Sequence, residues 1–384
     1  MAWLSDKKEE ATIKQLLRTL NDSRLKNRNQ AARELLIIGE AGAENLVATL
    51  SSSAPQQREM VSRILIQLGR KAIPALNIAM QNTSSSVQQE IIHVFQEMKN
   101  QEALESLFRS TKSKDYKIQI LSAKALQKIG DAQAIPYLLI ILNDEDPDVR
   151  VASVTALGSF REPETYANIT DLLDDTEINV RIAAVKAIGK IKDVSTIPYL
   201  VEALYDSFWW YGREEATETL LEAISSFGKA AIDELKEAMN AKEPTVRRYA
   251  IELLRPLRDI RVMDALQMAF YDTNYDVAES ALKAILDFGE TALPILSEAL
   301  ISPNIWIREK AVEGLAEIGG EEATINLLEM LSDEEISVRK ATIGSLSKLK
   351  DPRALPTLRA ISQKRENKEI AKLARQAIVA IEAP

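Results

Sequence analysis

The stretch that decides the fold is Asp144-Glu-Asp-Pro-Asp-Val-Arg-Val-Ala-Ser-Val-Thr-Ala-Leu-Gly158, which returns 31 residues later as Asp175-Thr-Glu-Ile-Asn-Val-Arg-Ile-Ala-Ala-Val-Lys-Ala-Ile-Gly189. Its Val-Arg start has further copies at Val246, Ile307 and Val338, and copies without the arginine at Ile118, Val277 and Ile370. Spacings of 30 to 32 residues tile most of the chain. A repeat of this length indicates stacked structural units.

Each unit is predicted to be two helices joined by a polar turn. The first helix is short and carries proline in its first turn, as in residues 134–142, where the missing N–H costs nothing. The second helix opens at Val-Arg, spaces its apolar residues three and four apart, and is expected to end at a glycine. These expected stops are Gly130, Gly158, Gly228, Gly289 and Gly319. A lone pair cannot bury its apolar face, so the pairs must stack.

The sequence therefore predicts an all-α fold, a right-handed α-solenoid of about twelve helix pairs that forms one domain, residues 1–384. Residues 101–384 carry clear repeats, and residues 1–100 carry degenerate ones. First helices are expected near residues 9, 41, 71, 101, 132, 163, 195, 229, 261, 291, 321 and 353. The second helices are expected to line a concave face.

Composition and charge exclude several classes of function. The net charge is -9, and residues 131–180 account for it with eleven acids against Arg150 and Arg161, so no basic stripe is left for nucleic acid. The longest apolar run near the middle, residues 135–142, is far shorter than the roughly 20 residues of a membrane helix. We expect no nucleic-acid partner, no membrane insertion and a cytoplasmic-type compartment. The acid-rich turns are read either as a rim for a basic partner or as a solvated edge.

The chain has few of the residues that cysteine and histidine chemistry requires. The chain has no cysteine, and His93 is its one histidine, so no Cys or second His can complete a zinc ligand set, and a Ser-His-Asp or Cys-His system is nearly excluded. Acid–base chemistry by Asp, Glu or Tyr stays open. We expect no metal site and no resident cofactor.

The aspartate of the turn and the arginine of the second helix recur together. Because stacked helices lie about 8–10 Å apart, each arginine can bridge carboxylates of adjacent repeats. We predict a structural ladder rather than a ligand site. Its members are Asp146, Asp148, Arg150, Asp175, Arg181, Arg247, Arg308, Asp333 and Arg339.

Aromatic residues gather in turns that are polar elsewhere. Protein interfaces are enriched in Trp, Tyr and Arg, so these turns predict a partner-binding surface. Its members are Phe208, Trp209, Trp210, Tyr211, Arg213, Tyr271, Tyr275 and Trp306. In a competing interpretation, Phe208 and Trp209 fill a gap in a longer seventh repeat. In the binding interpretation, Trp210, Tyr211 and Arg213 are the members expected to be exposed.

The pattern Asp-x-x-x-x-Val-Arg-x-x-Ala-x-x-Ala-Leu/Ile-Gly, with its following Ala-Ile-Pro-x-Leu helix, resembles HEAT repeats of the phycobilisome-lyase type. This repeat type occurs in bilin lyases, in relatives without lyase activity and in scaffolds. Residues 208–216 are similar to the Trp-Trp-x-Gly-Arg string near the start of E-type bilin lyases, but lie here in the seventh repeat. The chain is also similar to cyanobacterial HEAT-repeat adaptors that associate with iron-sulfur carrier proteins.

Two functions are compatible with these features. The first is a non-catalytic scaffold or adaptor that binds one or more proteins in the assembly or maturation of another complex. The alternative, implied by the resemblance alone, is a phycobilin lyase or chromophore chaperone with a bilin as its ligand. In that case Arg213 would pair with a propionate, and Asp206 or Tyr211 would assist proton movement.

Overall fold

The structure is a computed structural model that describes residues 2–51, 55–211, 213–363 and 367–383. In these residues the chain forms α-helices and short 3₁₀ turns, and no strand. Contacts between residues divide it into two compact units. One comprises residues 1–203 and 212–223, and the other comprises residues 204–211 and 224–384.

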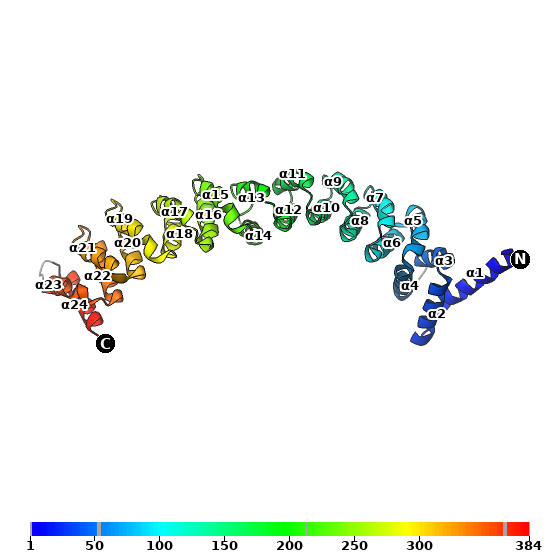
Figure 1. The fold of residues 1–384 in the computed structure, drawn as a ribbon, viewed down its shortest axis with the longest axis horizontal. Coiled ribbons are helices and arrows are strands. Elements are labelled where there is room, and N and C mark those ends of the chain that lie inside the picture. The colour runs from blue at the N-terminus through cyan, green and yellow to red at the C-terminus, as the bar shows by residue number, and fades with distance from the viewer. Residues whose placement is uncertain (1, 52–54, 212, 364–366, 384) are drawn as a thin grey trace. The chain divides into compact units, whose positions relative to one another are not determined.

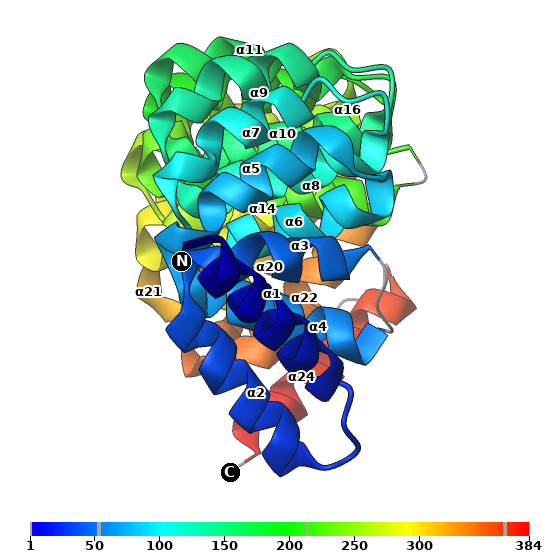
Figure 2. The same cartoon turned by 90° about the vertical axis from the view of Figure 1, so that its right-hand side faces the viewer.

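The first unit carries the helix pairs up to α14. Figure 1 shows its first helices α5, α7, α9 and α11 following one another on one side and its second helices α6, α8, α10 and α12 on the other. In Figure 2 the first helices from α3 to α11 lie one above another. The bounds are α1 (Ala2–Thr19) and α2 (Leu25–Ile38), α3 (Glu40–Leu50) and α4 (Pro55–Leu68), α5 (Ile73–Asn82) and α6 (Ser85–Met98), α7 (Leu104–Ser110) and α8 (Tyr116–Ile129), α9 (Ile135–Ile141) and α10 (Pro147–Phe160), α11 (Tyr166–Asp171) and α12 (Ile178–Ile191), and α13 (Ile197–Ala203) and α14 (Glu214–Ser225).

The second unit continues the same alternation of shorter and longer helices. Its pairs are α15 (Ile232–Ala238) and α16 (Pro244–Leu254), α17 (Met263–Phe270) and α18 (Tyr275–Leu286), α19 (Leu293–Ala299) and α20 (Ile305–Ile318), α21 (Gly320–Met330) and α22 (Ile336–Leu349), and α23 (Leu355–Gln363) and α24 (Lys368–Glu382). The predicted all-α solenoid of about twelve pairs is confirmed, since the described residues hold the pairs α1–α2 to α23–α24. The continuity of one array through both units, its right-handed sense and its concave face stay predictions.

Short 3₁₀ turns precede most of the first helices. The side chains of Asp131 and Asp193 accept the backbone N–H two residues on, which caps the turns before α9 and α13. Pro136 then lies in the first turn of α9, as expected, where a backbone N–H has no acceptor within the helix. Local sequence therefore fixes where these first helices begin.

Several second helices end at a residue other than the expected glycine, and that residue takes the left-handed backbone conformation. Gly130 does cap α8 with φ 75°, but Arg161 and Lys192 take this conformation after α10 and α12. The predicted stop at Gly158 is wrong, because α10 continues to Phe160. A Cβ at Gly158 would lie 2.6 Å from the Cβ of Ala187 on α12, so this glycine permits a close helix approach instead.

The core lies between the layer of first helices and the layer of second helices. Within each unit second helices pack on one another, as α10 does on α8 and α12 and as α20 does on α22, and first helices such as α3 and α5 also touch. Leu138 of α9 and Val154 and Leu157 of α10 are fully buried in this interior. Stacking thus covers the apolar face that one pair alone would leave in water.

Candidate functional site

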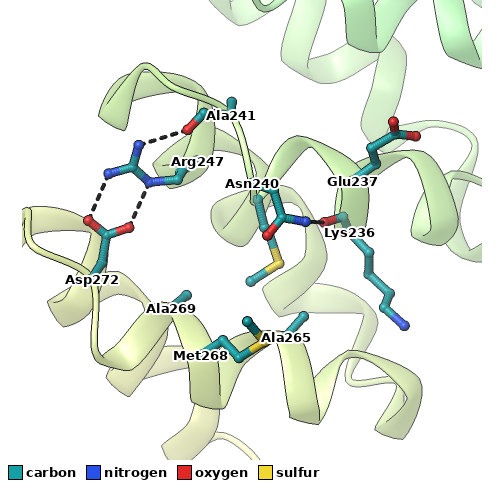
Figure 3. Close-up of a pocket in the computed structure, with 10 residues that line it drawn as sticks. Lys236, Glu237, Asn240, Ala241, Arg247, Ala265, Met268, Ala269 and Asp272 are labelled. Atoms are coloured by element: carbon teal, nitrogen blue, oxygen red, sulfur yellow. Dashed lines mark hydrogen bonds and ion pairs between the residues drawn. The ribbon is translucent and has the colours of Figure 1, made fainter.

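Arg247 of α16 ties its own turn to the turn of the following repeat (Figure 3). Its Nε and Nη2 donate to the two carboxylate oxygens of Asp272 at 2.6 and 2.7 Å. Its Nη1 donates to the carbonyls of Ala241 and Lys242, both at 2.8 Å. A bidentate, charge-assisted pair of this kind is among the stronger hydrogen-bonded contacts in proteins.

The same arrangement recurs in both units. Arg308 donates to Asp333 at 2.9 and 3.1 Å and to the Ser302 carbonyl at 2.8 Å. Arg150 donates to both oxygens of Asp175 at 2.8 Å. Each arginine therefore reaches the aspartate 25 residues further along the chain, in the next turn.

Four other residues of the predicted ladder make different contacts. Asp146 caps α10 by accepting the N–H of Asp148 at 2.9 Å, and Asp148 is exposed in the first helical turn. Neither takes Arg150 as its partner, because Arg150 is directed to Asp175 instead. Arg181 donates to the Asp175 carbonyl at 2.6 Å, and Arg339 donates to the carbonyls of the turn before α22.

Burial and composition both mark these pairs as structural. The side chains of Arg308 and Asp333 are only 6% and 7% exposed. Burial by itself raises the pKa of Asp272, but the hydrogen bonds from Arg247 and from the Asn274 N–H, together with the charge of Arg247, outweigh it and leave the pKa lowered. Where Ala278 replaces the arginine on α18, Ser302 replaces the aspartate of the next turn. At this place both members of the pair are replaced, whereas Asp144 is kept and receives Gln119 in place of an arginine.

We expect stability to fall at acid pH, with Asp351 as one cause. Hydrogen bonds from Arg353 lower the pKa of Asp351 to about 2. Its stabilising contribution is present above the unfolded pKa of about 3.9 and is lost as the pH falls through its folded value. The urea midpoint should hold between about pH 7 and 5 and decline below about pH 4. Asp351→Asn should show a shallower decline, and an equal decline in the variant would contradict this assignment.

A cavity of about 580 Å³ opens beside Arg247, on the turn side of α15 and α17 (Figure 3). Ala241 lines it, at the turn position where other repeats carry aspartate. The guanidinium is already bonded to Asp272 and two carbonyls, and Met239 and Met268 contribute an apolar lining. The cavity therefore suits an apolar side chain better than an anion.

Three of the predicted aromatic residues form one cluster near this cavity. The ring centroids of Tyr275 and Trp306 lie 5.2 Å apart, and Trp306 is 6.4 Å from the buried ring of Phe270. Tyr271 touches the same Phe270 ring at 5.7 Å. Tyr275 is 60% exposed and Tyr271 is 40% exposed, so the cluster packs on the buried Phe270 ring on one side and is open to solvent on the other.

The Trp-rich turn of the seventh repeat is divided between interior and surface. Trp209 is 1% exposed, so it fills the interior, and its predicted place on a binding surface is wrong. Phe208 and Trp210 are half-buried, and Trp210 Nε1 donates to the Leu204 carbonyl at 3.0 Å. Only Tyr211 among the four aromatic residues 208–211 is largely exposed, at 81%.

The structure also shows where the polar residues Asp206 and Arg213 of this turn lie. Arg213 is exposed and belongs to the first unit, whereas residues 204–211 belong to the second. The Asp206 carboxylate accepts the N–H of Phe208 at 2.9 Å and so closes the turn. Gly212 lies outside the described residues.

Exposed aliphatic residues on the same turns were missed by the sequence analysis. Met268 is 72% exposed and Ile301 84%, and Ile305 begins α20. The sequence could have identified Ile301, because the turn position that Ile301 and Tyr271 occupy is polar in most repeats. The residues at this position in other repeats include Lys112, Asn143, Asp174, Asn240 and Ser332. We call the surface formed by Met268, Tyr271, Tyr275, Ile301, Ile305 and Trp306 the α17–α20 turn surface.

In the part of the chain that the structure describes, no helix combines the length and the apolar character needed to cross a membrane. Nor does that part hold three or more His, Asp or Glu side chains grouped as metal ligands.

Comparison with known proteins identifies the repeat. A family model described as HEAT repeats matches residues 73–145, 136–221 and 290–379. No curated protein matches the chain. Among solved structures, the chain is similar to one in the structure of Kap95p with RanGDP, with 10% identity and a TM-score of 0.51 over 99% of this chain and 63% of that one.

Two further solved structures are similar to the chain with lower TM-scores. Kap121p bound to Ste12p is 13% identical with a TM-score of 0.42 over 98% of this chain and 53% of that one. Human deoxyhypusine hydroxylase is 19% identical with a TM-score of 0.30 over 85% and 100%. The chain thus spans less than two thirds of the Kap95p and Kap121p chains, and the Kap95p likeness shows the fold alone. Because the matched segments cover more than half of its residues, this protein belongs to the HEAT-repeat family.

Proposed function

We propose that this protein is a non-catalytic scaffold or adaptor that binds a protein partner through the α17–α20 turn surface. The observation that carries the proposal is the solvent-accessible cluster of Tyr271, Tyr275 and Trp306, in which Tyr271 and Trp306 hold positions that are polar in most other repeats. Kap95p, which has a similar fold, is described as binding RanGDP, so this fold can present a surface to another protein.

The cluster has the physical properties of an interface centre. Tyr275 and Trp306 rest on each other, and Lys310 Nζ lies 6.0 Å from the Trp306 ring centroid, so the rings are held in place before a partner arrives. Ordered aromatic side chains lose little conformational entropy on binding and bury a large apolar area. The adjoining cavity beside Met268 can receive one apolar side chain of the partner.

The test is capture of the partner from the native organism by affinity purification and mass spectrometry. The double variant Tyr275→Ser with Ile301→Ser should weaken binding of the captured protein about tenfold or more, because buried hot-spot side chains each contribute over about 1 kcal/mol. The matched control is Tyr199→Ser with Ile140→Ser, which removes side chains of similar exposure, 48% and 58%, from α13 and α9. Equal capture by the two double variants would remove this surface from the proposal.

The lyase alternative rests on the Trp-Trp-x-Gly-Arg resemblance at residues 209–213. Two observations speak against it: Trp209 is buried, and the Asp206 carboxylate accepts the N–H of Phe208 within its own turn. A change in the absorption spectrum of phycocyanobilin on mixing would revive it. The compartment in which the scaffold works, expected to be cytoplasmic in type, stays a prediction.

A further inference from the structure

The second helices α8, α10 and α12 of the first unit share an apolar row that the other repeats lack. Ile120, Val151 and Ile182 occupy the same position on these three helices, and each is half-buried. At this position the second helices α4, α6, α14, α16, α18, α20, α22 and α24 carry Glu59, Gln89, Glu218, Arg248, Glu279, Glu309, Lys340 and Lys372. An apolar residue here is therefore confined to three adjacent repeats.

Lysines flank this row, and acids are almost absent from it. Lys124 and Lys186 hold equivalent positions on α8 and α12, as do Lys128 and Lys190 one turn further on. Lys128 pairs with Glu97 at 2.7 Å, whereas Lys186 and Lys190 are exposed and make no ion pair with any described residue. Beyond the first turn of α10, the helices α8, α10 and α12 contain no Asp or Glu.

A cavity of about 510 Å³ lies along the α10 and α12 part of this row, and Val151, Ile182, Lys186 and Lys190 are among its lining residues. Glu215 of α14 is the one acid on its lining. Small residues keep it open toward the helix backbones, because Ala183 and Ala187 put little more than a methyl group into it. The close approach of α10 and α12 at Gly158 joins the two helices into one continuous surface. The surface thus has an apolar floor and, apart from Glu215, a cationic edge.

We propose that this surface, the α8–α12 groove of Ile120, Val151, Ile182, Lys124, Lys186 and Lys190, binds an acidic amphipathic helix of a protein partner. The proposal rests on the proposed protein-binding function but concerns a second, separate surface. Neighbouring second helices lie about 8–10 Å apart, which matches the roughly 10.5 Å rise of seven residues in a helix. A partner helix crossing the three repeats would place one apolar side chain on each and its carboxylates beside the lysines.

The apolar row favours a peptide over a nucleic acid as the occupant. The three apolar side chains have no use in holding a phosphate backbone, whereas an amphipathic helix buries its apolar stripe on them.

The probe is a fluorescein-labelled helical peptide of about three heptads, with leucine at the inward positions and glutamate beside them. Fluorescence anisotropy with the purified full chain should give a dissociation constant on the order of 1–10 μM that weakens with added salt. Lys186→Glu with Lys190→Ser should weaken binding at least about tenfold, and so should Ile182→Gln. Glu222, Ser159 and Gln89 occupy these positions in other repeats, so the variants are compatible with the fold.

The matched control is Lys283→Glu, at the position on α18 equivalent to Lys186 but beside Glu279 instead of an apolar residue. It should leave peptide binding unchanged. The proposal is overturned if a lysine version of the peptide binds as well, if a single-stranded oligonucleotide binds more tightly, or if the groove variants bind like the control. Since this titration does not involve the α17–α20 turn surface, either surface can fail its test while the other stands.

Discussion

Replacing Arg308 with methionine is expected to lower the free energy of unfolding by roughly 3–5 kcal/mol, because the change leaves a buried carboxylate without its counter-charge. Asp333 is 7% exposed and receives two hydrogen bonds from Arg308, whose third nitrogen holds the Ser302 carbonyl. Chemical denaturation followed by circular dichroism measures the effect.

The control for this variant is Arg255→Met. Arg255 also pairs with an aspartate of the following repeat, Asp287, at 2.6 Å, but its side chain is 43% exposed. Exposed pairs contribute about 0–1 kcal/mol, so this loss should be small. If Arg308→Met and Arg255→Met cost the same, the buried ladder does not stabilise the stack as described.

The second large effect is expected from adding one methyl group at Gly158. A Cβ there would lie 2.6 Å from the Cβ and 2.8 Å from the Cα of Ala187, and the Cα cannot move without shifting α12. We expect Gly158→Ala to cost about 1–3 kcal/mol, even though alanine favours a helix by about 1 kcal/mol over glycine. Thermal unfolding should show the lower midpoint.

Gly344→Ala is the matched control, because a Cβ at Gly344 on α22 meets no atom within 4 Å. There the helix propensity acts alone, and the variant should gain about 0.5–1 kcal/mol. Adding Ala187→Gly to Gly158→Ala should recover part of the loss, since it removes one of the two clashes. A stabilising Gly158→Ala would show that α10 and α12 are not so closely packed.

The fold could be predicted because its cause is local and repeated. Proline in the first helices and the Val-Arg start of the second helices recur in register, so helix pairs and their number follow from one chain. The partner of each ladder arginine was harder to predict. Arg150 lies near Asp146 in sequence, yet only the stacking of repeats decides that Asp175 receives its guanidinium.

The candidate site was predicted in part. Tyr271 and Trp306 stand out because their turn positions are polar in other repeats, which sequence alone reveals. The sequence left open whether Trp209 lies at the surface or in the interior, since the direction of each side chain in an irregular turn depends on tertiary packing. Gly158 resembled a helix stop because the need for close contact with Ala187 arises only after the helices stack.

The most direct test of the scaffold function places a photo-crosslinking amino acid at Tyr275 in the native organism and irradiates the cells. The same substitution at Tyr199, which is 48% exposed on α13, serves as the control. We predict a covalent adduct with a single protein partner from position 275 and none from position 199. An adduct that forms equally from both positions, or from neither, would contradict a partner bound at the α17–α20 turn surface.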